Sequence, residues 1–226
     1  MPAEPDLSRL GRTLGDPTRI RMLSFLMEGR ALTAKELAHG AGVAPATGTA
    51  HLQRLLADAL VIVRTQGRHK YFQLASPQVA HCVESLMVIA QPAAFAAAAQ
   101  PAPIHQARFC YDHLAGRIGT GITAALLERK VLRASGRDYV LTGAGGRWFE
   151  GFGIEPAAVA AQRRRFACAC LDWSERQDHL GGALGAALAQ RLLALGWLKR
   201  RTDSRVVTVT KPGALALATH FGLRLD

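Results

Sequence analysis

The sequence lacks the segments that would take a chain into or across a membrane. It has no uncharged apolar run of about 18 residues, the shortest length that is typical of a membrane-spanning helix. Its first residues, Met1 to Asp6, carry acidic side chains and lack the basic start and apolar core of a signal peptide. We therefore expect no membrane partner and a cytoplasmic location.

Acidic residues and cysteines are both scarce. The 226 residues include 17 Asp and Glu against 28 Lys and Arg, and the formal net charge is +11. This excess of positive charge suits a polyanionic partner, because a protein that neutralises phosphates releases their condensed counterions. The four cysteines are Cys82, Cys110, Cys168 and Cys170. In a reducing compartment such cysteines are typical of free thiols or metal ligands rather than disulfides.

The common signatures of an enzyme are absent as well. The sequence has no phosphate-binding glycine loop and no cofactor fingerprint. Cys110 and His113 would be the nucleophile and base of an enzyme, but nothing in the sequence supplies an oxyanion site for them. We therefore do not expect an enzyme.

The first 90 residues carry the start and stop signals of a winged helix-turn-helix. Asp16 before Pro17 marks a helix start, and Thr33 with Glu36 has the pattern of a capping box. The run Gln66-Gly67-Arg68 marks the turn of a hairpin. The expected elements are helices over 7–14, 17–28, 33–41, 45–58 and 76–90 and strands over 60–65 and 69–74.

The recognition helix and the wing of this motif carry side chains suited to DNA. The second of two helices joined by a tight turn fits the major groove, and here that helix is 45–58. Polar helix residues suit phosphates and base edges, and a basic wing suits phosphates or the minor groove. The predicted DNA-contacting residues are Thr47, Thr49, His51, Gln53 and Arg54 on the helix and Arg64, Arg68, His69 and Lys70 on the wing. The other interpretation is a protein-interaction domain in which these side chains form a solvated face.

Four segments of this region together resemble the ArsR/SmtB repressors. They are residues 14–23 (LGDPTRIRML), 36–38 (ELA), 51–55 (HLQRL) and 67–72 (GRHKYF). The resemblance covers residues 7–90. It implies a homodimer whose interface is made by the first and fifth helices. It also implies repression at double-stranded operator DNA, relieved when an effector lowers the DNA affinity.

The recognition helix departs from the usual pattern of that family. The family has serines where this chain has Ala44, Ala46 and Thr49, and a β-branched residue where it has Gly48. Ala44 offers no side-chain cap, which is a loss of ~1 kcal/mol. Gly48 costs up to about 1 kcal/mol inside a helix. The family's operator sequence therefore does not transfer to this chain.

The best-known sensor sites of the family are missing too. One is a thiolate site on the helix before the turn, which here spans 33–39 and has no cysteine. Another uses Asp/His pairs on the fifth helix, where His81 and Glu84 share a face but lack the further ligands that a site needs. We therefore expect regulation to enter through the second half of the chain.

The second half contains an internal repeat. Cys110-Tyr111-Asp112-His113 is echoed by Cys170-Leu171-Asp172 and, after an insertion, by His179. Each copy is expected to form a helix, a two-stranded ribbon and a second helix. Two copies alone favour a paired module rather than a solenoid.

The predicted fold class is mainly α with small β-hairpins (α+β). A winged helix-turn-helix for DNA binding and dimerisation spans 1–100, and an effector domain spans 104–226 after a Pro/Ala-rich linker at 100–103. The effector domain consists of two winged-helix-like repeats, at about 105–154 and about 165–226.

Cysteine and histidine recur at matching positions in the two copies. Cys110 and His113 stand three apart on an expected helix, so both can face one ion, and Cys170 and His179 are their counterparts. If the copies pack about a pseudo-two-fold axis, these four residues converge into a Cys₂His₂ metal site with Cys168 as a further thiolate. Two alternatives stay open: thiol oxidation, and cysteines that are small buried hydrophobes beside packing histidines.

The sequence as a whole predicts a homodimeric transcriptional repressor that leaves its operator when the C-terminal half senses an effector. The effector is a zinc-like or thiophilic metal ion or metalloid, an oxidant, or an organic small molecule in an apolar cavity between the repeats. The alternative is a DNA-binding regulator whose C-terminal repeats are a protein-interaction scaffold with no small effector.

Overall fold

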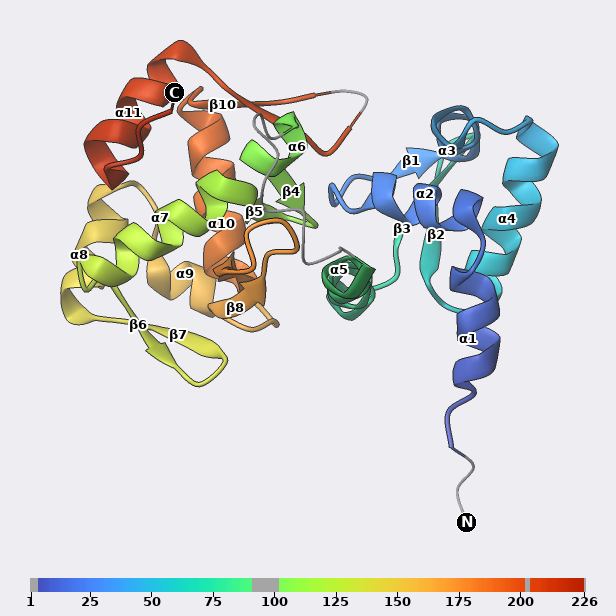
Figure 1. The fold of residues 1–226 in the computed structure, drawn as a ribbon, viewed down its shortest axis with the longest axis horizontal. Coiled ribbons are helices and arrows are strands. Elements are labelled where there is room, and N and C mark those ends of the chain that lie inside the picture. Colours follow the sequence, from blue (N-terminus) through green and yellow to red (C-terminus); the bar gives the residue numbers. More distant parts are fainter. Residues whose placement is uncertain (1–3, 91–101, 202–203, 226) are drawn as a thin grey trace. The chain divides into compact units, whose positions relative to one another are not determined.

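The computed structural model describes residues 4–90, 102–201 and 204–225. The chain forms two compact units, Met1–Val83 and Glu84–Asp226, and the boundary falls inside helix α5 (Pro77–Ala90) (Figure 1). The predicted linker at 100–103 begins outside the described residues, and its last residue begins helix α6 (Pro103–Gln106). Within the described ranges, no helix combines the length and apolarity that a bilayer crossing needs.

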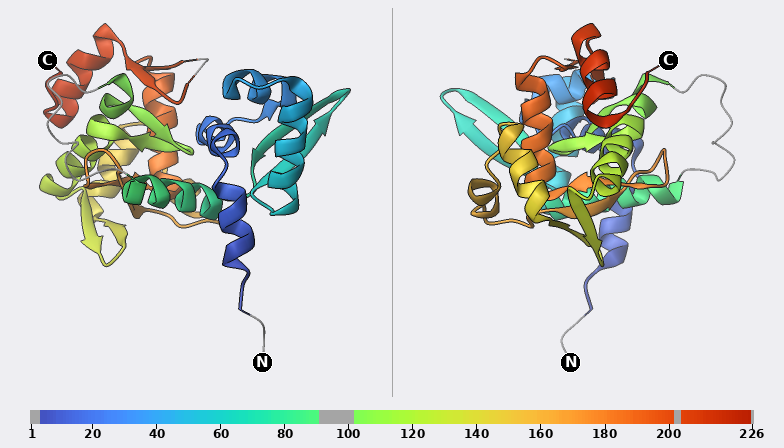
Figure 2. Two further views of the ribbon diagram at one scale, coloured as in Figure 1. Left: turned by 45° about the vertical axis from the view of Figure 1, so that its right-hand side comes forward. Right: turned by 90° about the vertical axis from the view of Figure 1, so that its left-hand side faces the viewer.

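The first unit is a winged helix-turn-helix, as the sequence predicts. It contains α1 (Leu7–Leu14), α2 (Pro17–Leu26), β1 (Leu32–Thr33), α3 (Ala34–Ala41), α4 (Pro45–Ala57), β2 (Val61–Gln66), β3 (His69–Leu74) and the first half of α5. The strands form an antiparallel sheet in the order β1-β3-β2. The β2–β3 hairpin is the wing, and its tip stands away from the helices of its unit (Figure 2).

Local hydrogen bonds explain where the helices of the first unit begin. The Asp16 carboxylate accepts the backbone N–H groups two and three residues ahead, at 2.9 and 3.0 Å. Thr33 and Glu36 form the predicted capping box, in which the Thr33 N–H donates to Oε2 of Glu36 at 2.7 Å and the Glu36 N–H donates to Oγ1 of Thr33 at 3.3 Å. Ala44 precedes α4 without a side-chain cap, which agrees with the missing serine.

The core of the first unit lies between α2, α3 and α4. Its buried side chains include Met22, Leu23, Leu26, Leu37, Leu52 and Leu55. Gly48 lies where α4 meets α3, and a Cβ added to it would be 2.6 Å from the Cβ of Ala38. A β-branched residue does not fit at that separation, so the packing of this chain requires the glycine that departs from the family pattern.

The second unit combines helices with short hairpins. After α6 it contains β4 (Arg108–Cys110), β5 (His113–Ala115), α7 (Gly116–Glu128), β6 (Leu132–Ser135), β7 (Asp138–Leu141), α8 (Gly143–Gly151), α9 (Pro156–Ala160), β8 (Cys168–Leu171), β9 (Asp178–Gly181), α10 (Gly182–Ala194), β10 (Leu198–Arg200), β11 (Val207–Val209) and α11 (Lys211–Phe221). Both copies of the repeat therefore run hairpin, helix, hairpin, helix, with α9 between them (Figure 1).

The first element of each copy is a hairpin, so the prediction of a helix there was wrong. Cys110 faces His113 across β4–β5, and Cys170 faces His179 across β8–β9. Residues that face each other across a two-residue turn are also three apart in sequence, so the spacing of Cys110 and His113 fits a helix and a tight hairpin equally well. Tyr111 makes the turn with a φ of 63°.

The two copies interlock through their hairpins. The backbone hydrogen bonds between copies, given as donor and acceptor, are Phe109 to Arg205 and Val207 to Ala107 at 2.9 Å, and Tyr139 to Ala167 and Ala169 to Arg137 at 3.1 Å. The first hairpin of each copy thus joins the second hairpin region of the other, through the same bonds at equivalent positions. This is the pseudo-two-fold arrangement on which the predicted Cys/His cluster depends.

One core serves both copies. Its fully buried side chains include Phe109, Ile118, Leu126, Phe149, Leu184 and Leu192. A Cβ on Gly119 would lie 2.4 Å from the carbonyl oxygen of Leu114, and one on Gly185 would lie 2.1 Å from that of Leu180. Each glycine lets its helix approach the hairpin that precedes it, which explains why the repeat keeps glycine at both positions.

Candidate DNA-binding surface and Cys/His cluster

α4 presents four of the predicted DNA-contacting residues to solvent. Thr47, Thr49, Gln53 and Arg54 are exposed, and Thr49 and Gln53 are four apart, so they lie on one face of the helix. The Thr49 hydroxyl donates to the Pro45 carbonyl at 3.0 Å, which leaves its oxygen able to accept a hydrogen bond. The face therefore offers the donors and acceptors that pair with base edges.

His51 lies against α2 rather than in the open. Its side chain is 17% exposed, and its Nδ1 is 3.7 Å from Oδ1 of Asp16 and 3.4 Å from Nη1 of Arg19. His51 therefore connects the recognition helix to the start of α2.

Arg54 belongs to a network that joins α4 to α1. Its Nε donates to Oγ1 of Thr13 at 3.0 Å and lies 3.2 Å from Oδ2 of Asp58. The Asp58 carboxylate also accepts the Thr13 hydroxyl and pairs with Arg9 at 3.2 Å. The hydrogen bond from Thr13 lowers the pKa of Asp58 against the opposing effect of burial, and Arg54 and Arg9 lower it further. No local sequence pattern points to Thr13 or Asp58, because the link joins residues 45 positions apart.

The wing carries its predicted basic residues in the open. The exposed residues are Arg64, Arg68, His69 and Lys70. Gln66 pairs with His69 and closes a two-residue turn in which Gly67 has a φ of 58°. The turn gathers the positive charge at the tip of the hairpin, where it can meet phosphates.

The structure brings Cys110, His113, Cys170 and His179 together inside the second unit. One potential ligand atom from each residue lies within 4.8 Å of the other three, and all four residues are buried. The two sulfurs are 3.9 Å apart, and the centroids of the two imidazole rings are 5.1 Å apart. Each copy of the repeat contributes one cross-strand Cys–His pair, so the interlocked hairpins produce the cluster.

Cys168 lies beside this cluster and is not one of the four. It stands two residues before Cys170 on strand β8, where side chains two apart point to the same face, and not on a helix. Its sulfur and Nε2 of His113 both flank Gly181, 3.2 and 3.3 Å from the position of a Cβ there. Burial raises the pKa of the Cys168 thiol, and Arg165 only partly opposes this.

Two aspartates, to which sequence analysis assigned no role, contact the outer nitrogens of the histidines. Nδ1 of His113 is 3.2 Å from Oδ1 of Asp112, and Nδ1 of His179 is 3.5 Å from Oδ2 of Asp172. The Nε2 atoms of both rings and Nδ1 of His179 are buried and have no hydrogen-bond partner within the described part of the chain. Both aspartates stand two residues after the cysteine of their copy, and this matching position is the signal that points to them.

Each aspartate is held in turn by an arginine. Arg164 pairs with Asp112. Arg108 is fully buried, and its Nη2 donates to Oδ1 of Asp172 at 2.8 Å. Burial alone would raise the pKa of Asp172, but His179 and Arg108 lower it far below its usual range. Both carboxylates are therefore ionised and already balanced by a positive charge.

The network extends to α5 through Glu84. The Glu84 carboxylate is buried and accepts Nη2 of Arg108 at 3.4 Å and Nη1 of Arg205 at 3.2 Å. His81 on the same helix is exposed. Glu84 is therefore a partner of arginines, and through Arg108 it connects α5 to Asp172.

Burial, hydrogen bonds and neighbouring charges together set the charge states of the cluster. The hydrogen bond with Cys170 and burial raise the pKa of the Cys110 thiol well above its usual value. Burial disfavours a charged His113, but Cys110 and Asp112 outweigh it and raise the pKa of His113 to about 10. A thiol with a raised pKa carries no charge at neutral pH, so Asp112 is the neighbour that favours the imidazolium there. A nucleophilic cysteine needs the opposite, a lowered pKa.

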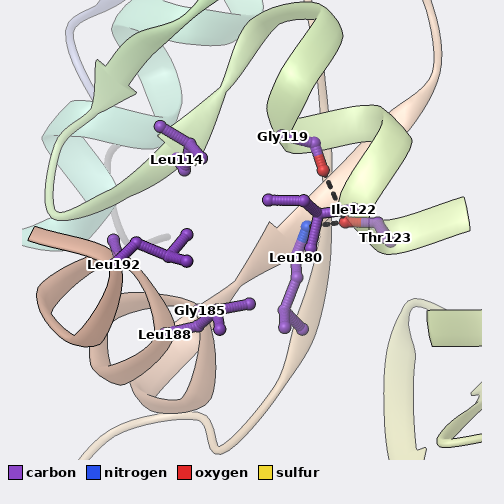
Figure 3. Close-up of a pocket in the computed structure, with 9 residues that line it drawn as sticks. Leu114, Gly119, Ile122, Thr123, Leu180, Gly185, Leu188 and Leu192 are labelled. Carbon is purple, nitrogen blue, oxygen red and sulfur yellow. Dashed lines mark hydrogen bonds between the residues drawn. The ribbon is translucent and has the colours of Figure 1, made fainter. Parts of the chain in front are cut away.

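An apolar space between the copies is too small for an organic effector. It is lined by Leu114, Gly119, Ile122, Thr123, Leu180, Gly185, Leu188, Ala189 and Leu192 (Figure 3). Its volume is about 10 Å³, about the room that one water molecule needs. Sites for organic ligands begin at about 300 Å³. An organic effector in this space would therefore require the core to open.

Comparison with known proteins finds relatives of both units. A helix-turn-helix domain family matches residues 14–64. The chain is 37% identical over 224 residues to the uncharacterized HTH-type transcriptional regulator YdfF of Bacillus subtilis. This alignment covers 98% of this chain and 99% of the relative. It is 34% identical over 86 residues to the HTH-type transcriptional regulator CmtR of Mycobacterium bovis. This second alignment covers 38% of this chain and 72% of the relative.

Among solved structures, one similar protein is the homodimeric winged helix-turn-helix DNA-binding domain of a possible ArsR-family transcriptional regulator from Mycobacterium bovis. It is 26% identical, covers 40% of this chain and 90% of that chain, and has a TM-score of 0.35. The relative from Bacillus subtilis matches both units, so the second unit is found with a helix-turn-helix in another protein.

Proposed function

This chain belongs to the ArsR family of helix-turn-helix transcriptional regulators, and we propose that it is a homodimeric repressor whose DNA binding is controlled through the second unit. One observation carries the proposal: the exposed polar face of α4 beside a basic wing, in a chain related to a transcriptional regulator along 98% of its length. A helix-turn-helix of this kind reads duplex DNA with its second helix in the major groove.

Three groups of residues have separate roles in DNA binding. Thr47, Thr49 and Gln53 face the base edges from α4. His51 and Arg54 hold this helix against α2 and α1, so we assign them to positioning the DNA reader. The residues of the wing, Arg64, Arg68, His69 and Lys70, contact phosphates.

Dimerisation through α1 and α5 is supported by apolar side chains that these helices leave in solvent. Leu7 on α1 is 74% exposed, and Leu86 and Ile89 on α5 are 39% and 79% exposed. A second protomer would remove this apolar area from water, a gain of about 25 cal/mol per Å². The mass in solution is expected to be twice the 24.2 kDa of one chain, and Leu7→Glu with Ile89→Glu should halve it.

Control through the second unit is supported by the distribution of ligand-type residues. The first unit has one cysteine, Cys82, and it is exposed. The second unit gathers the buried Cys/His cluster and connects it to α5 through Asp172, Arg108 and Glu84. Effector binding in this unit therefore has a physical route to the helix that the two units share.

The proposal is tested by DNA binding to a duplex from the chain's own promoter region, measured by fluorescence anisotropy at several salt concentrations. The affinity should fall steeply with salt, with a slope of about −0.9 in log–log form for each phosphate contacted. Arg68→Ala with Lys70→Ala should weaken binding to all sequences and reduce the slope by about 2. Gln53→Ala should reduce the preference for the promoter duplex over a scrambled one.

The hairpin β6–β7 of the second unit offers a matched control. Arg133 and Arg137 are exposed basic residues on it, and Arg133→Ala with Arg137→Ala removes the same charge as the wing variant. The control should leave the affinity within twofold of that of the unmodified chain. An equal loss in both double variants, or binding that ignores salt, would contradict a wing-and-helix DNA reader.

A further inference from the structure

We propose that Cys110, His113, Cys170 and His179 form a closed, four-coordinate site for one zinc-type divalent ion. The ligand atoms are the two sulfurs and one nitrogen of each imidazole, and we assign Nε2 because it is buried without a partner in both rings. If the ion is the effector of the second unit, the effector is a divalent metal ion. That regulatory role rests on the proposed function. The binding of the ion itself stands on the geometry of the second unit alone.

The separation of the sulfurs matches a shared tetrahedral ion. Zinc–sulfur bonds are about 2.3 Å long, so two sulfurs on one tetrahedral zinc lie about 3.8 Å apart. The Cys110 and Cys170 sulfurs are 3.9 Å apart. A disulfide would need them at about 2.05 Å. The hairpins thus hold the two sulfurs at the separation of metal ligands and well beyond that of a bond.

The histidines are oriented as metal ligands are. Nδ1 of His113 is hydrogen-bonded to Oδ1 of Asp112 at 3.2 Å, and Nδ1 of His179 lies 3.5 Å from Oδ2 of Asp172 without forming a hydrogen bond. Nε2 of each ring is buried and, among the residues described, has no hydrogen-bond partner. An unpaired buried nitrogen costs free energy. A metal ion would satisfy both Nε2 atoms, and on the His113 side it would complete a carboxylate–histidine–metal arrangement.

The charge of the bound ion would be balanced inside the cluster. Two thiolates and two neutral imidazoles carry a total of two negative charges, which cancel those of a divalent cation. As the ion binds, the proton of each thiol and the extra proton of the His113 imidazolium leave to solvent, so that each imidazole presents Nε2 without a proton. Asp112 and Asp172 add no net charge, because Arg164 and Arg108 already balance them. A neutral complex of this kind is suited to a site without water.

The donor set selects the class of ion. Two sulfurs and two imidazole nitrogens suit Zn²⁺ and similar borderline or soft ions, whereas Mg²⁺ and Ca²⁺ prefer oxygen ligands. Four protein ligands leave no open position, as in zinc sites that hold structure together. Because each copy of the repeat supplies one Cys–His pair, the ion would tie the two copies to each other.

Cobalt titration of the full-length chain tests the site. The metal-free, reduced chain should bind one Co²⁺ and develop the ligand-field absorption of tetrahedral Co²⁺ together with a thiolate charge-transfer band, and Zn²⁺ should remove both. Cys110→Ser and His179→Asn should abolish the tetrahedral spectrum. Asp112→Asn should keep one ion per chain and weaken its affinity roughly 10–100-fold.

Two other cysteines provide matched controls. Cys82 is exposed on α5, and Cys168 lies beside the cluster. Cys82→Ser and Cys168→Ser should both keep one tetrahedral Co²⁺ per chain. Loss of binding in Cys168→Ser would overturn the assignment of the four ligands.

X-ray absorption at the zinc edge of the unmodified chain keeps the test independent of how well the variants fold. The expected first shell is two sulfurs at about 2.3 Å and two nitrogens at about 2.0–2.1 Å. The proposal is overturned if the chain binds no Co²⁺ or Zn²⁺, if bound Co²⁺ is octahedral, or if Cys110→Ser with Cys170→Ser retains the ion. A Cys110–Cys170 disulfide in a chain that takes up no metal would favour thiol oxidation instead. None of these outcomes affects the DNA-binding test with the wing variants, so the two proposals fail separately.

Discussion

Single buried side chains hold the DNA reader in place, and Asp58 is the clearest case. Its side chain is 3% exposed, it receives the Thr13 hydroxyl from α1, and it pairs with Arg54 of α4. Arg9 of α1 adds a second ion pair. The carboxylate therefore fixes the recognition helix to the first helix of the chain.

This role predicts a pH-dependent cost for Asp58→Asn. The pKa of Asp58 is lowered in the folded chain, so its ionised form stabilises the fold above the unfolded value of about 3.9 and loses this effect as pH falls below it. The difference in free energy of unfolding between the two proteins should be largest near pH 7 and shrink as pH falls below about 4. Urea unfolding followed by circular dichroism measures it. A difference that stays constant or widens in acid would contradict this account.

Gly48 predicts that a better helix former can destabilise a helix. Replacing an exposed helical glycine by alanine gains about 0.5–1 kcal/mol, and Gly11 of α1, with nothing within 4 Å of its Cβ position, should show this gain. Gly48→Ala should instead cost about 1–3 kcal/mol, because its Cβ would overlap Ala38. Adding Ala38→Gly should recover part of the loss. A gain in Gly48→Ala equal to that in Gly11→Ala would show that α3 and α4 do not meet so closely.

At the scale of elements, local signals decided what the sequence could predict. The helix predicted over 45–58 is α4 (Pro45–Ala57), and the predicted strand over 69–74 is β3, because proline, capping residues and a two-residue turn act over a few positions. The helix predicted around Cys110 and His113 is instead the hairpin β4–β5, because a three-residue spacing does not distinguish a helix from a tight hairpin. The matching positions in the repeat still predicted a Cys/His cluster. The contacts of Arg108 could not be predicted in this way, because its partners lie 24 and 64 positions away in the sequence.

Arg108 of β4 is buried and joins α5 to the loop after β8, and its replacement tests how these elements are held together. Arg108→Met would leave Glu84 and Asp172 buried with a positive partner removed, and should destabilise the second unit by about 3–5 kcal/mol. Adding Glu84→Gln should recover part of this loss. All three tryptophans, Trp148, Trp173 and Trp197, lie in the second unit, so their fluorescence follows its unfolding alone.

The exposed Arg133 on β6 is the control for that measurement. Arg133→Met should change the stability of the second unit by no more than about 0.5 kcal/mol, because the residue is exposed. If Arg108→Met were equally mild, the carboxylates of Glu84 and Asp172 would not depend on it, and the proposed route from the cluster to α5 would lose its support.

At the scale of the whole molecule, one helix belongs to both units. Val83 ends the first unit, and Glu84 begins the second within the same turn of α5. Glu84 connects through Arg108 and Asp172 to His179 of the cluster. This chain of contacts within the second unit reaches the helix that continues into the first unit, and on this basis we propose that the cluster controls DNA binding.

The DNA affinity of the full-length chain with and without zinc tests this central claim most directly. Allosteric coupling commonly changes affinity 5–150-fold, and the account predicts that one Zn²⁺ per chain weakens binding to the promoter duplex by about tenfold or more. Cys110→Ser with Cys170→Ser should bind the duplex equally with and without zinc, and Cys82→Ser should respond as the unmodified chain does. Equal DNA affinity in the zinc-free and zinc-loaded chain, with one ion shown to be bound, would contradict the claim that the cluster controls the DNA reader.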